Sequence, residues 1–475
     1  MVVELVIILT MTLAGWSVAM LAGLDRINSS ATVLGSPLLG TAVSVLASAV
    51  MLALGFGIQI WLHLAVLGVL LFAAAVHLIR APTPWRPLIL LTQSMVVAGS
   101  SIALLSASLR PVLTHDSYRF IMLGRMASAG DLEMSEAMLA DYPIGGIQLQ
   151  FLAAALEGEF LVYTAPVAGL LGLIGGVLLI LNPDREPIPR GITFALSVAS
   201  AMIVATSYML RLQLSLLNSH VMVAGFVTFG AAIALAPLHR SSRRPVLMTS
   251  ALMLGALALS RAEGPFIVAL ILIALAASET AHKRDWVPLS LIVLAPALIW
   301  YLRMIQSGGT GEILSPARVV VLLVAIAAPI VLISTTRLAI LRQHTAALST
   351  GAATAVLILV AVIKPDGTAV STAHLISNLS VSGLWGVVWW LVLPLAGVLA
   401  IAAPPIRNEK PWLIVLLGFA VLIVVLGAVR DFPYRLGFGD SGNRMATHIL
   451  GLAIGFVIAK MRPRPDDATQ MNSST

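Results

Sequence analysis

Long apolar runs separated by short polar connectors form the dominant pattern of this chain. A helix needs about 20 apolar residues to cross a hydrocarbon core about 30 Å thick, and runs close to this length recur from end to end. Backbone groups in lipid have to form their hydrogen bonds internally, so the pattern predicts an all-α, polytopic transmembrane bundle of about 13–15 spans. The candidate spans lie at residues 2–23, 36–56, 58–79, 87–108, 160–181, 191–209, 219–238, 245–260, 264–278, 287–303, 317–334, 348–363, 384–403, 411–429 and 445–460.

The composition supports the same class of protein. Hydrophobic residues make up 59% of the 475 residues, charged residues make up 10%, and the mean hydropathy is +1.00. The first apolar run begins at Val2 without a basic segment before it, which favours a retained span over a cleaved signal peptide. We therefore expect residues 1–464 to form a single transmembrane domain and residues 465–475 a disordered cytoplasmic tail.

The distribution of positive charge predicts the orientation of the bundle. Alternate connectors hold most of the 28 Lys and Arg residues, and connectors rich in these residues face the cytoplasm. This assignment predicts a multi-pass protein of the plasma (cytoplasmic) membrane with its N-terminus outside. Because orientation accounts for the formal net charge of +7, no nucleic-acid partner is expected. The cytoplasmic set comprises Arg26, Arg80, Arg86, Arg185, Arg190, Arg240, Arg243, Arg244, Lys283, Arg284, Arg337, Arg342, Arg407, Lys410, Lys460, Arg462 and Arg464.

The connectors on the opposite, extracytoplasmic side are longer and chemically richer. They lie near residues 109–159, 303–318, 364–383 and 430–448. Loops on a rigid scaffold are frequent carriers of function, so the site is expected on this face. Within the first connector, the pattern predicts an interfacial amphipathic helix beginning at Asp116 and a second at 131–143, ended by Pro143.

A cluster of polar residues opens that first connector, in "LTHDSYRFIMLGRM". His115, Asp116, Tyr118 and Arg119 stand together directly after an apolar run. One interpretation is structural, with Asp116 as the N-cap of the helix that follows. The other is catalytic, with Asp116 as a general base that takes a proton from a substrate hydroxyl, and with the three neighbours contacting substrate.

The segments "HDSYRF…GRM…G…DYP" and "LSRAEGP" resemble motifs of the GT-C superfamily of membrane glycosyltransferases. The likeness is to actinobacterial enzymes that use polyprenyl-phosphate mannose or arabinose. It implies an inverting transfer of sugar from a lipid monophosphate to a lipid- or envelope-linked acceptor, with residues 109–159 as the catalytic loop and Asp116 as the base. The chain departs from many members in having His115 before Asp116, where those members have two acids.

A sugar-phosphate donor needs cationic side chains near the outer headgroup level, and guanidinium groups match phosphate oxygens well. The segment "FPYRLGFGDSGNRM" offers Arg435 and Arg444, with Asp440 as a further substrate contact and the next acid to test as a base. In the same segment, Ser441 or Asn443 is expected to cap the last span. The alternative is a loop with a snorkelling arginine. Further candidates for substrate binding are Arg261, Arg303 and Lys364.

Two other polar groups admit structural explanations. Arg261 and Glu263, in "SRAEG", either neutralise each other at the surface or support the floor of the site. His115, His374 and His448 all fall on the outer side without short metal-ligand spacing, and His220 is expected to be an interface residue. With no cysteine in the chain, no metal site is predicted and no cofactor is expected, although a divalent ion is compatible with the family.

These observations favour an enzyme whose partners are a polyprenyl-phosphate sugar donor, a glycan or glycolipid acceptor and the lipid bilayer. A polymerase or ligase of lipid-linked glycans would use the same face and the same chemistry. A transporter or flippase of lipid-linked saccharides would place ionisable residues inside spans and often show inverted repeats, and the sequence has neither pattern.

Overall fold

The computed structural model of the chain describes residues 1–56, 58–80, 85–129, 144–156, 160–181, 206–235, 240–278, 283–306, 338–403, 409–430 and 433–461. These residues form helices and connecting turns, with a single isolated bridge between Val112 and Leu216 and no strand among them. Seven of the helices are long and apolar enough to cross a membrane, and up to eight are if one bent pair counts as a span. The all-α, multi-pass prediction is therefore confirmed.

The helices follow the predicted apolar runs closely wherever the chain is described. Their bounds are α1 (Val2–Leu21), α2 (Ser29–Ala53), α3 (Ile60–Ile79), α4 (Trp85–Ser108), α5 (His115–Ala129), α7 (Gln148–Ala155), α8 (Thr164–Leu181), α10 (Tyr208–Ser215), α11 (His220–Leu235), α12 (Arg240–Ala258), α13 (Gly264–Ala277), α14 (Lys283–Gln306), α16 (Leu338–Ile363), α17 (Pro365–Ser377), α18 (Val388–Ala402), α19 (Glu409–Val429), α20 (Ser441–Met445) and α21 (Thr447–Met461). Three short turns, η1 (Leu24–Arg26), η2 (Ile144–Gly146) and η3 (Asn378–Ser382), complete the order. The spans predicted at 191–209 and 317–334 fall mainly outside the described residues, as do the helix at 131–143 and the tail at 465–475.

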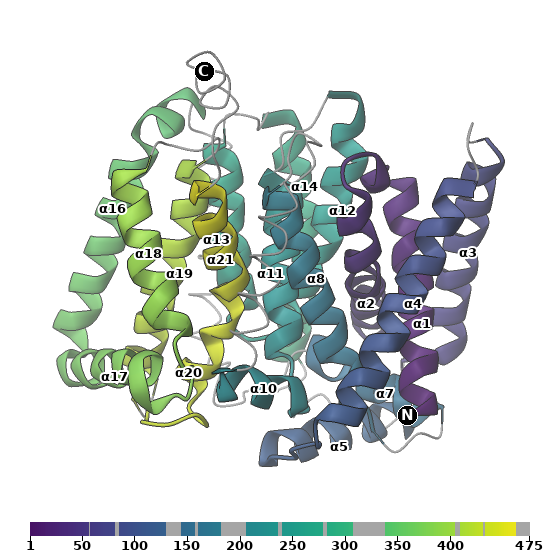
Figure 1. The fold of residues 1–475 in the computed structure, drawn as a ribbon, viewed down its shortest axis with the longest axis horizontal. Helices are drawn as coiled ribbons and strands as arrows, with labels where there is room; N and C mark the ends of the chain where they lie inside the picture. The colour runs from purple at the N-terminus through teal and green to yellow at the C-terminus, as the bar shows by residue number, and fades with distance from the viewer. Residues whose placement is uncertain are drawn as a thin grey trace, which may run out of the picture.

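The long helices run side by side, and the short ones gather at one end of the bundle (Figure 1). Helices α5, α7, α10, α17 and α20 lie at this end, together with the N-terminus. We call it the α5 end. The chain crosses the bundle four times, as α1 to α4, before it reaches α5. An even number of crossings returns the chain to its starting side, so the N-terminus and the first rich connector share a face.

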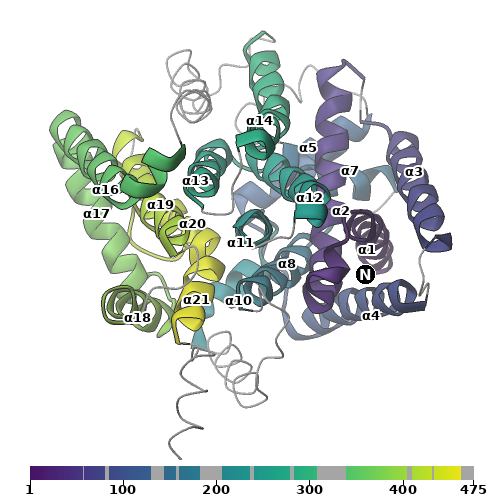
Figure 2. The ribbon, with the colours of Figure 1, turned by 90° about the horizontal axis from the view of Figure 1, so that it is seen from above.

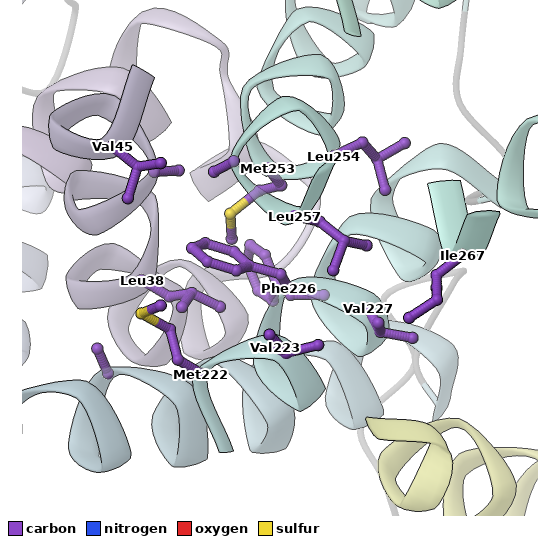
Figure 3. Close-up of a cluster of buried hydrophobic side chains, with 14 of the residues drawn as sticks. Leu38, Val45, Met222, Val223, Phe226, Val227, Met253, Leu254, Leu257 and Ile267 are labelled. Carbon is purple, nitrogen blue, oxygen red and sulfur yellow. The ribbon is translucent and has the colours of Figure 1, made fainter. Parts of the chain in front are cut away.

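Helix α11 lies at the centre of the bundle, beside α8 and α12 in the view from above (Figure 2). Every residue of α11 is buried, which explains why its sequence is apolar on all sides. Its side chains Met222, Val223 and Phe226 pack with Leu38 of α2 and Leu257 of α12 (Figure 3). The flanking helices therefore pack around α11. Its first residue, His220, is buried with the rest of the helix and has a fixed position.

Glycines let α8 and α11 approach closely at this centre. A Cβ atom built on Gly169 of α8 would overlap backbone atoms of Val221, and one built on Gly225 of α11 would overlap backbone atoms of Gly169. Small residues at crossing points are the usual way in which membrane helices pack without a hydrophobic driving force between them.

We expect Gly225→Leu to prevent this packing and to destabilise the bundle. Overpacking of a well-packed core costs about 1–3 kcal/mol where side chains can move aside, and here the obstacle is backbone. The measurement is thermal unfolding in detergent. Gly397→Leu in α18 is the matched control, since no atom lies within 4 Å of a Cβ built there. Equal melting temperatures for the two variants would contradict the importance of this crossing.

Candidate functional site at the α5 end

Helix α5 begins at His115, one residue before Asp116, which was one candidate for its N-cap. The backbone N–H of Ser117 donates to Thr114 Oγ1 (3.4 Å), and the backbone N–H of Thr114 donates to Ser117 Oγ (3.1 Å). This reciprocal pair closes the start of the helix. The interpretation of Asp116 as an N-cap is therefore wrong, because Thr114 fills that role and leaves the Asp116 carboxylate in the first turn of α5.

The Asp116 carboxylate instead pairs with a side chain from the far end of the sequence. Arg444 Nη1 donates to Asp116 Oδ2 at 3.2 Å, and the two side chains are 18% and 32% exposed, respectively. The pair joins the first turn of α5 to α20. It thus brings together, across 328 positions, two segments that were each predicted to contribute to the site.

Helix α20 carries Arg444 and is held in place by hydrogen bonds from its flanking loop. Asp440 caps it, since Asp440 Oδ2 accepts from the backbone N–H groups of Gly442 (2.8 Å) and Asn443 (3.3 Å). The other oxygen, Oδ1, accepts from the backbone N–H of Arg435 (2.9 Å). The expected cap, Ser441 or Asn443, is therefore wrong, and these contacts show that Asp440 organises the loop.

Buried partners on neighbouring helices complete the support of this loop. Tyr434 is 1% exposed, and its hydroxyl donates to the backbone carbonyl of Ile423 (2.7 Å). The side chain of Asn378 donates to the backbone carbonyl of Arg435 and accepts from the backbone N–H of Gly437, both at 2.8 Å. The Arg444 guanidinium consequently projects from a rigid segment, as a preorganised binding group requires.

The turn between α12 and α13 forms a second charged element. Arg261 Nε donates to Glu263 Oε1 at 3.1 Å, and Glu263 is 7% exposed. Burial is the largest single effect and raises the pKa of the Glu263 carboxyl, but the positive charge of Arg261, the interaction with His448 and the hydrogen bonds to the carboxylate together outweigh it and hold this pKa below its usual value. The two residues do neutralise each other, yet they do so in the interior and not at the surface as one interpretation had it.

The η2 turn connects this charged element to the first outer connector. The backbone N–H of Gly145 donates to the carbonyl of Leu259 (2.8 Å), and a Cβ built on Gly145 would overlap Ser260. Gly146 lies close to both Phe120 of α5 and Ser219, which precedes α11. The start of α5, the α12–α13 turn and the start of α11 are therefore neighbours at the α5 end.

A pair of histidines is the part of this region that the sequence did not predict. His220 Nδ1 and His448 Nε2 lie 2.9 Å apart, and both residues are fully buried. His220 is the first residue of α11 and His448 the second residue of α21, so each lies at the N-terminal end of an apolar run. That shared position is the one signal by which the sequence could have linked them, since 228 residues separate them.

The other predicted substrate contacts are more dispersed. His115 and Tyr118 are exposed on the first turn of α5, beside Asp116, and Arg119 is half-buried. The Arg435 side chain is exposed, although its backbone is fixed by Asp440. Lys364 is exposed at the corner of 119° between α16 and α17, and these helices form the left edge of the bundle in Figure 1, whereas α5 lies near the middle. The side chain of Arg303, on α14, lies outside the described residues.

The described residues contain no group of three or more His, Cys, Asp or Glu side chains that could hold a metal ion. What the arrangement does offer is a half-buried carboxylate, two guanidinium groups and a buried, hydrogen-bonded pair of imidazoles near one another. In comparisons with known proteins, no family model, no curated protein and no solved structure matches this chain.

Proposed function

We propose that this chain is a membrane glycosyltransferase that moves a sugar from a polyprenyl-phosphate donor to a lipid- or envelope-linked acceptor. The reaction takes place on the extracytoplasmic face of the plasma membrane, with inversion at the sugar carbon. The observation that carries the proposal is the ion pair between Asp116 and Arg444, which couples a candidate base to a candidate phosphate ligand.

The ion pair suggests how donor binding and proton transfer are coupled. In the structure, the Arg444 guanidinium neutralises the Asp116 carboxylate and occupies its Oδ2. A donor phosphate that binds Arg444 competes with Asp116 for this group and withdraws the guanidinium from Asp116 Oδ2, so that this oxygen can accept the proton of the acceptor hydroxyl. The phosphate leaves as the polyprenyl phosphate while the new glycosidic bond forms, so Asp116 acts when both substrates are present.

The experiment is transfer by the purified chain in detergent, with polyprenyl-phosphate mannose or arabinose as donor and extracted envelope lipids as acceptors. We expect a product one sugar heavier than its acceptor, detected by mass spectrometry. A ligase or polymerase would instead add several sugar units in one step. A flippase would form no product in detergent, where there are no two sides to exchange, and either result would contradict the proposal.

Orientation gives an independent prediction, and the absence of cysteine from the chain makes its test clean. Single cysteines at Tyr118, Asp366 and Leu436, all exposed at the α5 end, should react with an impermeant maleimide in intact cells. A cysteine at Lys410, exposed at the start of α19, should react only after the cells are opened. Ser117 is unsuitable as a probe position because it is fully buried. The reverse labelling pattern would put the α5 end in the cytoplasm.

A further inference from the structure

The His220–His448 pair has more hydrogen-bonding capacity than the protein uses. The bond between Nδ1 of His220 and Nε2 of His448 occupies one nitrogen of each ring. The other two nitrogens, His220 Nε2 and His448 Nδ1, are buried and have no hydrogen-bond partner among the described residues. Buried polar atoms are nearly always paired in native proteins, so two orphaned nitrogens in one contacting pair point to a missing partner.

Further orphaned atoms surround the pair. Ten buried side-chain nitrogen and oxygen atoms lack a partner within the described part of the chain, and six of them belong to this region. They are Ser219 Oγ, His220 Nε2, Tyr301 Oη, Arg444 Nε, Thr447 Oγ1 and His448 Nδ1. Ser219 and Thr447 are sequence neighbours of the two histidines. Tyr301 lies within electrostatic range of Glu263, which in turn interacts with His448.

The charges around the histidines compensate each other. Asp116 pairs with Arg444, and Glu263 pairs with Arg261. Arg261 and Arg444 both lie close enough to His220 to interact with it electrostatically. Both rings are fully buried, where an uncompensated charge is costly, and the bond between them requires one unprotonated nitrogen. The region is therefore electrically balanced around two neutral rings.

A neutral pair presents a defined pattern at its two open nitrogens. If His220 donates to His448, the open nitrogen of His220 is an acceptor and that of His448 is a donor; the reverse tautomers exchange these roles. In both cases the pair offers one donor and one acceptor. An anion only accepts hydrogen bonds and would leave the acceptor nitrogen unpaired. A hydroxyl group both donates and accepts, so it can satisfy either end.

We propose that His220 and His448, with Tyr301 and Thr447, bind the hydroxyl groups of an uncharged sugar ring, which is the sugar of the donor. This inference rests on the proposed function for the lipid-phosphate part of that donor. Arg444 on α20 and His448 on α21 are four residues apart within one candidate span, Ser441–Met461, and Arg444 also lies close enough to His220 to interact with it. A phosphate at Arg444 accordingly places the attached sugar beside His448. The pair acts on recognition of the sugar and not on proton transfer.

The test compares the binding of polyprenyl-phosphate mannose, polyprenyl-phosphate arabinose and bare polyprenyl phosphate to the purified full chain. We expect at least one sugar-bearing lipid to bind about tenfold or more tightly than the bare lipid, since it gains hydrogen bonds to buried groups. In the double variant His220→Phe/His448→Phe this preference should disappear. The double change removes both polar rings together and so leaves no orphaned partner between them.

Thr228→Val is the matched control, because Thr228 Oγ1 is another orphaned buried atom of α11, deeper in the bundle. It should keep the full preference for the sugar. If the histidine double variant melts like the unmutated chain and retains the preference, the inference is overturned. A sugar lipid that binds the unmutated chain no better than the bare lipid overturns it too.

A second test needs no substitution and is unaffected if the double variant fails to fold. On the unmutated chain, removal of single hydroxyls from the bound sugar should weaken binding about tenfold at one position or more. If every deoxy sugar binds like the parent, the inference is wrong. Transfer assayed in the same samples separates the two proposals. A sugar preference without transfer contradicts the glycosyltransferase alone, and transfer with an unaltered preference in the double variant contradicts the sugar site alone.

Discussion

The Asp116→Asn variant is expected to fold and to bind donor lipid, but to transfer sugar about 10²–10⁴ times more slowly than the unmutated chain. The physical reason is that an amide cannot accept the proton of the acceptor hydroxyl. Its stability should hold, because Thr114 and not Asp116 closes the start of α5, and because a partly exposed ion pair contributes little to folding. Single-turnover transfer and thermal unfolding of the purified variant measure the two effects separately.

The control for this variant is Asp366→Asn, which removes an exposed carboxylate from the first turn of α17 at the same end of the bundle. It should transfer sugar at the unmutated rate. Removal of a positioned base should lower the rate at least about 10²-fold. If Asp116→Asn retains more than about a tenth of the unmutated rate, its loss is smaller than that, and the base is another residue. Asp440→Asn is then the next variant, since asparagine preserves capping.

Replacement of Arg444 by alanine is expected to weaken the binding of polyprenyl-phosphate donors by about one to two orders of magnitude. A hydrogen bond to a charged group contributes about 1.5–3 kcal/mol, which corresponds to that range of affinity. The variant also leaves Asp116 without the guanidinium that lies 3.2 Å away. Donor affinity and the transfer rate at saturating donor should therefore both fall, in contrast to Asp116→Asn, which lowers the rate without weakening donor binding.

Arg80→Ala is the matched control, because it removes an exposed guanidinium at the end of α3, away from the α5 end. Unchanged donor affinity in Arg444→Ala would show that the guanidinium serves only to hold Asp116. Arg435→Ala distinguishes the two arginines of the last outer loop. Its exposed side chain should contribute less to donor binding than Arg444, whose orphaned Nε lies in the interior.

Much of the fold could be predicted from the sequence because the physics of a membrane helix is local. A run such as Ile60–Ile79 satisfies its backbone hydrogen bonds within itself, so its apolar length is enough to identify it. Apolar length also identifies the helix Glu409–Val429. Helix α5 was predicted from a different local signal, an amphipathic pattern that follows an apolar span. The clustering of the polar connectors on one face followed from the alternation of crossings.

Helix caps were predicted less well, because several residues near a helix end have the chemistry to fill that role. Thr114 closes α5 where Asp116 was one candidate, and Asp440 caps α20 where Ser441 or Asn443 was expected. In both segments a residue one to three positions earlier reaches the free backbone N–H groups. The chosen residue depends on where the helix begins, and that in turn depends on how the neighbouring helices pack.

The sequence by itself determined that this is a multi-pass helical membrane protein and which connectors carry its polar chemistry. Only the tertiary structure decided which of those polar groups meet. The pairs Asp116–Arg444 and His220–His448 join residues separated by 328 and 228 positions. No periodicity in the sequence encodes such a contact, because it depends on how distant helices pack. One example of this packing is the crossing of α8 and α11, where Gly169 and Gly225 have no side chain and the two backbones approach closely.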